Sequence, residues 1–189
     1  MNRKGGLNQM NDLMIDLETL GTSNNAVIVQ IGACFFDRYT GIVETGIRYN
    51  ISIDSCLAYG LQVDGGALEF WLNQKNRTWL DNQKPLKDVL EHFKKYIMQQ
   101  EGIINSKNIT TWAHATFDFP ILINAFKKTK VYFPIGYRSL RDIRTLVDLS
   151  GGYKPLEETE EATHDALDDC KRQVRYCTKA FNIIKEKRV

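Results

Sequence analysis

Two carboxylates in the first predicted strand are the clearest candidates for chemistry. Asp16 and Glu18 lie two residues apart in the stretch DLMIDLE (12–18). In a strand both side chains therefore point to one side, whereas Ile15 and Leu17 point to the other. Two neighbouring acids repel each other, and a divalent cation between them would relieve that repulsion. Taken alone, the pair is more simply explained as a solvated strand face.

A third acid, Asp118, lies among aromatic residues in WAHATFDFP (112–120). It follows one predicted strand and precedes a predicted helix. A negative charge near the N-terminus of a helix is favoured by the helix dipole, and an aspartate there often caps the helix. For Asp118 considered alone, capping is the better interpretation.

A histidine and several acids, HDALDD (164–169), open the last predicted helix. Histidine titrates near neutral pH and can act as a general base. His164 shares a helix face with Asp168, as Asp165 does with Asp169. If His164 instead lies in the loop before the helix, Asp169 can turn toward it. Spacing alone therefore does not decide whether Asp168 or Asp169 is the acid that accompanies His164. The structural alternative is an acidic first turn that only complements the helix dipole.

Composition excludes several classes of protein. The 189 residues include 25 Lys+Arg and 23 Asp+Glu, so the net charge of +2 does not predict a nucleic-acid binder. Binding of a polyanion would have to come from local basic patches or from bound metal ions. The sequence contains no run of about 18 apolar residues, the length that a membrane-spanning helix needs. Residues 1–10 lack the apolar core of a signal peptide. The four cysteines lack zinc-type spacing, so we expect buried, reduced thiols and a cytoplasmic protein: Cys34, Cys56, Cys170 and Cys177.

The expected elements begin with strands and continue mainly with helices. Strands are predicted at 12–18, 26–37, 42–53 and 109–113, and helices at 67–74, 86–100, 119–128, 140–149 and about 163–185. Three antiparallel strands followed by α/β elements is the order of the ribonuclease-H-like fold, one option for this layout. That fold is α/β, with a mixed sheet and helices on both faces. Residues 1–9 are expected to form a disordered leader, with Met10 as an alternative start, and residues 10–189 a single domain.

The ordered set of motifs resembles the DEDDh family of 3′–5′ exonucleases, a branch of the ribonuclease-H-like superfamily. The similarity runs from about Met10 onward and is greatest to the phage exonuclease A, or exodeoxyribonuclease VIII-like, group and its mycobacterial exoribonuclease relatives. It includes the stretches IDLET (15–19), FDFPIL (117–122) and RDIRT (141–145). The five matching residues are Asp16, Glu18, Asp118, His164 and Asp169. In this family the acid five positions after the histidine belongs to the metal site, so the resemblance selects Asp169 over Asp168.

The resemblance implies a site with two divalent cations, Mg²⁺ or Mn²⁺. Asp16 would bridge both ions, Glu18 and Asp169 would hold the ion beside the nucleophile, and Asp118 would hold the other. His164 would take a proton from the attacking water. The expected partner is the 3′ end of a nucleic acid, single-stranded or frayed, which would be shortened by nucleoside 5′-monophosphates. Relatives often work as dimers, so a homodimer is a further expectation.

Other residues are candidate substrate contacts. The residues just after the first motif would pack on the terminal nucleotide: Thr19, Leu20 and Gly21. The rings of Trp71 and Phe117 would stack on bases. Arg141 and Arg144 would bind phosphate. Core packing is the alternative for Trp71, and ion pairing with Asp142 or Asp148 is the alternative for the arginines.

The motifs do not distinguish DNA from RNA. DNA is favoured because the phage-type resemblance is greater, and an exoribonuclease or an oligonucleotide-degrading enzyme is the alternative. An endonuclease on the same fold is a rival within the nucleases. A non-catalytic nucleic-acid-binding module is a rival of another class, against which the presence of all five matching residues argues.

Overall fold

The computed structural model describes residues 10–101, 109–152 and 162–187; the leader predicted at residues 1–9 lies outside the described residues. Its centre is a five-stranded mixed sheet in the order β3-β2-β1-β4-β5. β2 is antiparallel to both β1 and β3, β4 is parallel to β1, and β5 is parallel to β4. The strands are β1 (Asp12–Thr19), β2 (Ile28–Phe36), β3 (Ile47–Asn50), β4 (Thr110–Ala113) and β5 (Leu140–Asp142). This arrangement confirms the predicted fold class.

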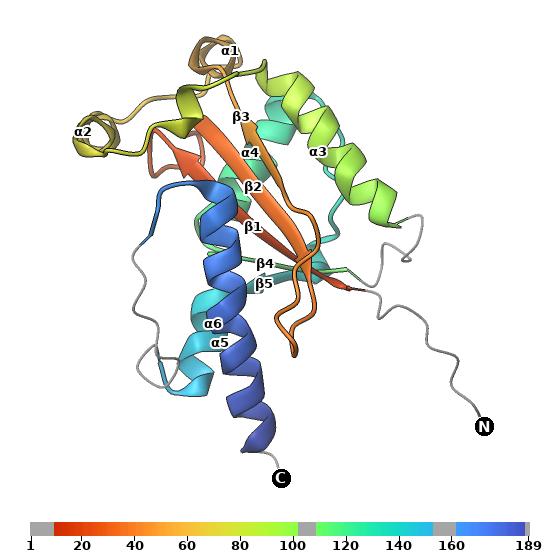
Figure 1. Cartoon of the computed structure of the whole chain (residues 1–189). Helices are drawn as coiled ribbons and strands as arrows, with labels where there is room; N and C mark the ends of the chain where they lie inside the picture. The colour runs from red at the N-terminus through yellow and green to blue at the C-terminus, as the bar shows by residue number, and fades with distance from the viewer. Residues whose placement is uncertain (1–9, 102–108, 153–161, 188–189) are drawn as a thin grey trace.

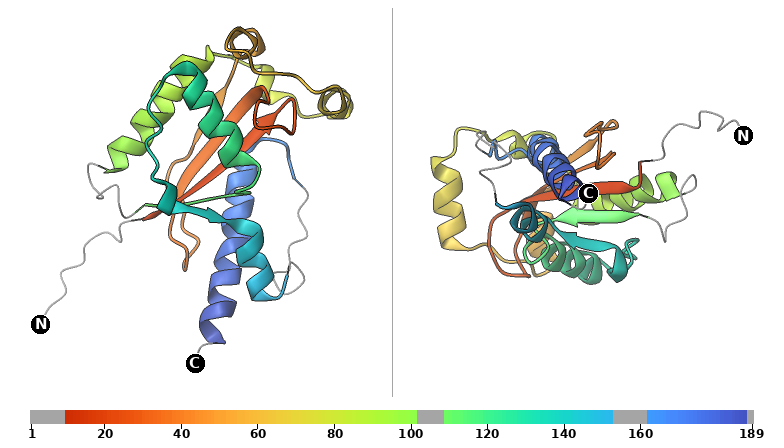
Figure 2. Two further views of the ribbon diagram at one scale, coloured as in Figure 1. Left: turned by 180° about the vertical axis from the view of Figure 1, so that it is seen from behind. Right: turned by 90° about the horizontal axis from the view of Figure 1, so that it is seen from below.

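Helices cover both faces of the sheet (Figures 1 and 2). One face carries α5 (Ile143–Ser150) and α6 (Ala166–Glu186), and the other carries α3 (Leu86–Glu101) and α4 (Asp118–Thr129). Two short helices, α1 (Ile53–Ala58) and α2 (Gly65–Asn73), and the turn η1 (Thr78–Leu80) follow β3, and the turn η3 (Tyr137–Ser139) precedes β5. In the described part of the chain, no helix is both long and apolar enough to span a bilayer.

The alternation along β1 decides which way its acids point. Leu13, Ile15 and Leu17 belong to the apolar core that includes residues of α3 and α4, whereas Met14 belongs to the second core, with residues of α5 and α6. Because side chains alternate along a strand, Asp16 and Glu18 share the side of Met14. The acids therefore face the layer that contains α6. All four cysteines are free and buried, as expected.

A glycine lets α6 begin in direct contact with the sheet. Gly32 on β2 pairs with Asp16 on β1. A Cβ at position 32 would lie 2.2 Å from the Ala166 carbonyl carbon and 2.5 Å from the Leu167 nitrogen. The missing side chain thus allows the first turn of α6 to pack on the strand beside Asp16.

Three predicted boundaries are wrong, and a side-chain cap contributes to each difference. Asp142 accepts a hydrogen bond from Thr145, so the predicted helix 140–149 is β5 followed by α5. Asp165 caps α6, which begins at Ala166 rather than near 163. The predicted strand 42–53 is reduced to β3, because residue 43 makes only an isolated bridge and Ser52 caps α1.

Replacing Gly32 by alanine should push the start of α6 away from β2. We expect a loss of about 1–3 kcal/mol in the free energy of unfolding, the usual cost of overpacking, measured by urea denaturation. Gly65→Ala is the matched control, because a Cβ there meets nothing within 4 Å. Equal stability of the two variants would contradict the close contact.

Candidate active site

Four carboxylates from three separate elements converge on one cavity. Asp16 and Glu18 come from β1, Asp118 from the first turn of α4, and Asp169 from the first turn of α6. All four side chains are buried. They line a cavity of about 280 Å³ together with His164. The structure therefore brings together all five residues that match the DEDDh motifs.

The ligand atoms in this cavity form two groups, each compact enough to surround one cation. Among the described residues, one group joins Asp16, His114 and Asp118, and the other joins Glu18, His164 and Asp169. Within each group the nitrogen and oxygen atoms lie within 4.8 Å of one another. Carboxylate oxygens are the ligands that Mg²⁺ prefers, and imidazole nitrogen is accepted by several transition metals. The donor set therefore fits divalent cations.

Asp118 is positioned by the turn that connects β4 to α4. Its carboxylate accepts a hydrogen bond from the backbone N–H of His114 at 2.8 Å. The cap residue of α4 is Phe117, which makes no side-chain capping bond. Asp118 therefore does not act as the N-cap of α4, and its carboxylate is available to the cavity.

Asp169 is held by the chain that precedes α6. Its carboxylate accepts hydrogen bonds from the backbone N–H groups of Thr163 at 3.1 Å and His164 at 3.0 Å. Arg172 pairs with it at 3.3 Å. Asp168 is exposed and pairs with Lys171 instead. The structure thus places Asp169 in the cavity and Asp168 outside it.

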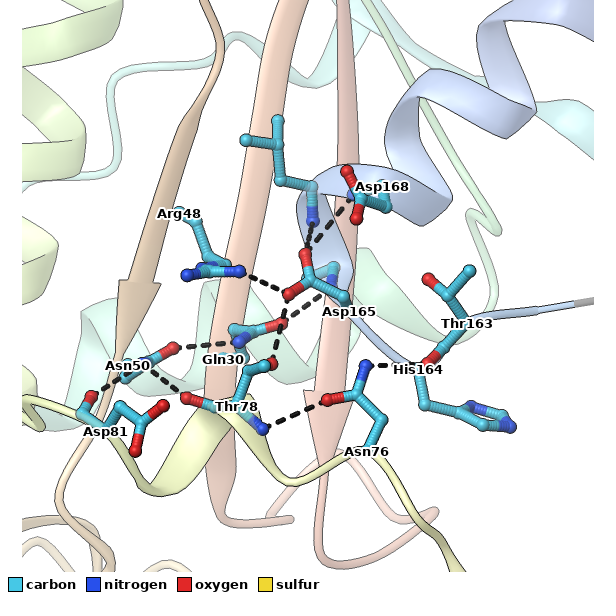
Figure 3. A network of polar contacts seen from close by, with 12 residues as sticks. Gln30, Arg48, Asn50, Asn76, Thr78, Asp81, Thr163, His164, Asp165 and Asp168 are labelled. Atoms are coloured by element: carbon cyan, nitrogen blue, oxygen red, sulfur yellow. Dashed lines mark hydrogen bonds and ion pairs between the residues drawn. The ribbon is translucent and has the colours of Figure 1, made fainter.

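A polar network centred on Asp165, the N-cap of α6, holds the start of this helix in place (Figure 3). One oxygen of Asp165 accepts hydrogen bonds from Arg48 and Thr78, and the other accepts from the first amides of the helix. Asn76 donates to the carbonyl oxygen of Thr163 at 2.8 Å. The network ties β3 and the segment at η1 to the chain that carries the histidine.

His164 occupies an unusual backbone conformation and lies against aromatic rings. Its φ of 53° is in the left-handed region, which costs free energy for a residue other than glycine. Its ring centroid lies 5.0 Å from that of Phe70 and 5.9 Å from that of Trp71, both edge-to-face. These contacts and the network around Asp165 hold the imidazole at the mouth of the acidic cavity.

Burial and mutual repulsion make these acids reluctant to ionise. Burial is the main cause that raises the pKa of Asp16, Glu18 and Asp118, to about 8 for Glu18 and about 7 for Asp118. Repulsion adds to this effect: Asp118 and Glu18 raise the pKa of Asp16, and Asp169 raises that of Glu18. A cation bound between the acids would favour the ionised forms.

A second cavity of about 360 Å³ adjoins the acidic one and has mostly apolar walls. Glu18, Phe117 and His164 line both cavities, and α2 forms the far wall through Gly66, Ala67 and Phe70. The two cavities are therefore adjacent parts of one site.

Five of the seven predicted substrate contacts line at least one of the two cavities, and Leu20 and Arg141 line neither. Thr19, Gly21, Trp71 and Phe117 line the apolar cavity, and Arg144 lines the acidic one. Leu20 is buried in the core, and Arg141 donates to the carbonyl oxygens of Arg138 and Leu140. Trp71 is itself buried and donates to the Thr19 carbonyl oxygen at 2.9 Å, so it also packs in the core, which was the alternative interpretation.

Sequence reasoning missed several residues of the site, among them Phe70, His114 and Gln173. Phe70 is 42% exposed and faces the histidine. Gln173 is buried and donates to Asp16 at 2.7 Å. One spacing could have revealed Gln173, because it lies one helical turn after Asp169 on α6.

Comparison with known proteins identifies the family. Residues 11–181 match the family model of the Rv2179c-like 3′–5′ exoribonuclease domain. The chain belongs to this family. It is therefore a hydrolytic 3′–5′ exonuclease, and the Rv2179c-like domain extends over nearly all of the chain. An exodeoxyribonuclease of Enterobacteria phage T4 is 25% identical over 204 aligned positions, which cover 87% of this chain and 86% of the phage protein.

Solved structures support the same fold for the Rv2179c-like domain. The nuclease domain of 3′hExo, a DEDDh family member bound to rAMP, gives a TM-score of 0.58 at 13% identity, covering 90% of this chain and 91% of that one. Pop2p of S. pombe, in a form with Mg²⁺ and Mn²⁺ bound, gives a TM-score of 0.58 at 15% identity, covering 88% of this chain and 81% of that one. These neighbours and the family match confirm the resemblance to DEDDh exonucleases.

The stability of the metal-free protein should fall as pH rises. Glu18 has a raised pKa of about 8 against an ordinary 4.5, so its protonated form is favoured in the folded state and the stability that this provides is lost toward pH 8. We expect the Tm in EDTA to fall between about pH 5.5 and 8.5. Added Mn²⁺ should raise the Tm more at the higher pH.

Glu18→Gln is the control for this pH dependence. The amide cannot ionise, so the variant should show a shallower fall in Tm over the same range. A Tm that is flat in EDTA for both proteins would show that burial and repulsion do not raise the pKa of Glu18 as described.

Proposed function

We propose that the chain uses two divalent cations to remove nucleoside 5′-monophosphates from the 3′ end of a nucleic acid, with DNA favoured over RNA. The observation that carries this proposal is the convergence of buried acids into two compact ligand groups beside a cavity with apolar walls. Residues 10–189 would form one exonuclease domain. A cytoplasmic location and a homodimer remain predictions of the sequence.

Mg²⁺ or Mn²⁺ suits the oxygen-rich donors of the site. Asp16 would contact both ions, Glu18 and Asp169 would hold one, and Asp118 would hold the other. This division matches the two ligand groups, in which Glu18 and Asp169 are together and Asp16 and Asp118 are together. When bound, the ions supply the positive charge that orients the scissile phosphate and stabilises the leaving oxygen.

His164 would act as the general base. A water oxygen forms a bond to phosphorus, the bond from phosphorus to the 3′ oxygen breaks, and the water proton passes to the imidazole. The 3′ oxygen takes a proton from solvent. The left-handed backbone and the contacts with Phe70 and Trp71 support this role, because they fix the ring beside Glu18 and Asp169.

The apolar cavity would receive the terminal nucleoside. Phe70 and Phe117 lie on its walls, and stacking of a base on an aromatic ring is worth about 1–3 kcal/mol. Arg144 lines the acidic cavity and would contact a phosphate. Because both cavities open from the end of β1, a single-stranded or frayed 3′ end would enter between α2 and the start of α4.

DNA and RNA are supported by different observations. The exodeoxyribonuclease of phage T4 supports DNA. The description of the family as an exoribonuclease domain supports RNA as the second candidate. A site that distinguishes the two must respond to the 2′-hydroxyl.

One degradation panel tests direction and substrate together. It compares 5′- and 3′-labelled DNA and RNA oligomers of one sequence, single- and double-stranded, with Mg²⁺ or Mn²⁺. We expect 3′ label to be released as mononucleotide and 5′-labelled DNA to shorten stepwise and faster than RNA. Faster loss of RNA would select the second candidate, and cleavage of a circular single strand would indicate an endonuclease.

Two substitutions should separate metal binding from proton transfer. His164→Ala should lower kcat by about 10²–10⁴-fold, the usual contribution of a general base, with smaller effects on Mn²⁺ affinity. Asp16→Asn should weaken both activity and Mn²⁺ binding, measured by calorimetry. Asp168→Asn is the matched control, since this acid is exposed outside the cavity. Full activity of His164→Ala would remove the histidine from the mechanism.

A further inference from the structure

His114 lies in the acidic cavity although none of the DEDDh motifs includes it. It follows β4 directly, and its main chain closes the turn into α4. Its carbonyl oxygen accepts hydrogen bonds from Phe117 at 2.8 Å and Asp118 at 3.0 Å, and its N–H donates to the Asp118 carboxylate. Three backbone bonds thus fix where the side chain starts, and the side chain lines the cavity.

The imidazole of His114 faces two carboxylates. A ring nitrogen lies within 4.8 Å of ligand oxygens of both Asp16 and Asp118. Two atoms that are each about 2.1 Å from one ion can be at most about 4.2 Å apart. The observed spacing therefore needs only a small adjustment of side chains to place all three ligand atoms around one cation.

The ring has no hydrogen-bond partner among the residues that the structure describes, although it is half-buried. The ring nitrogens are thus not engaged by any described residue, and an imidazole nitrogen is a common metal ligand.

We propose that His114 is a direct ligand of the divalent cation held by Asp16 and Asp118. This inference rests on the proposed function and adds a nitrogen donor to an otherwise oxygen-only site. Imidazole suits transition metals better than Mg²⁺, which prefers oxygen. The Asp16–Asp118 position should therefore bind Mn²⁺ in preference to Mg²⁺, and His114 should be the source of that preference.

Pulsed electron paramagnetic resonance on the full chain tests the ligand directly. Mn²⁺ bound to imidazole nitrogen shows a ¹⁴N hyperfine coupling, and the chain has three histidines. We expect the coupling in the unmodified protein, its loss in His114→Ala and its retention in His164→Ala. His92→Gln is the matched control, because His92 lies beside Tyr49 outside both cavities.

Calorimetry gives a second measurement. His114→Ala should lower the Mn²⁺ affinity of one site by at least about 10-fold, while Mg²⁺ affinity changes much less. His114→Asn keeps a polar side chain at the turn and should reproduce the loss of ¹⁴N coupling if the alanine variant does not fold.

The outcomes separate this inference from the proposed function. Mn²⁺ bound with a ¹⁴N coupling that survives in folded His114→Ala or His114→Asn would overturn the ligand role and leave the two-metal site standing. Absence of Mn²⁺ binding in the unmodified protein would overturn the proposed function itself. An equal loss of Mn²⁺ and Mg²⁺ affinity would show that His114 only supports the turn.

Discussion

The repulsion among buried carboxylates is the constraint on which the rest of this structure depends. Four acids share one cavity, and their burial would normally be avoided because ionised groups lose hydration there. Three of them are therefore held individually: Asp16 by Gln173, Asp118 by the N–H of His114, and Asp169 by the backbone before α6. These bonds orient the carboxylates toward the cavity. A cation bound there would favour the ionised forms that burial and repulsion disfavour.

The fold brings these acids together through close backbone approach and one capped helix. The first turn of α6 can lie on β2 because Gly32 has no side chain. Its register is set by Asp165, which caps the helix and bonds to Arg48 and Thr78. If α6 began one residue earlier or later, a different face of its first turn would meet β1, and Asp169 would leave the cavity.

The same elements join the acidic cavity to an apolar one. The aromatic rings of α2 contact His164, so the side chain proposed to move a proton forms part of the wall proposed to hold a base. Trp71 contributes to both, since it packs on Trp79 in the core and lines the cavity. Correct placement of the terminal nucleotide and correct placement of the His164 imidazole would therefore depend on one another.

The amino-acid sequence by itself determined the fold class, the alternation that places Asp16 and Glu18 on one side of β1, and the three motifs that match the DEDDh family. These features are local, because strand period and motif order can be read along the chain. The sequence also predicted the main helices, although not where α5 and α6 begin.

Only the tertiary structure decided which groups meet in the cavity. Helix spacing allowed either Asp168 or Asp169, and only the family resemblance selected Asp169. The physical reason for that choice is the cap at Asp165, whose partners come from β3 and η1. His114 and Phe70 were missed because each lacks a sequence pattern of its own and faces the acids or the histidine only after β1, α2, α4 and α6 have packed. Contacts between residues far apart in the chain depend on that packing, and local propensity does not encode them.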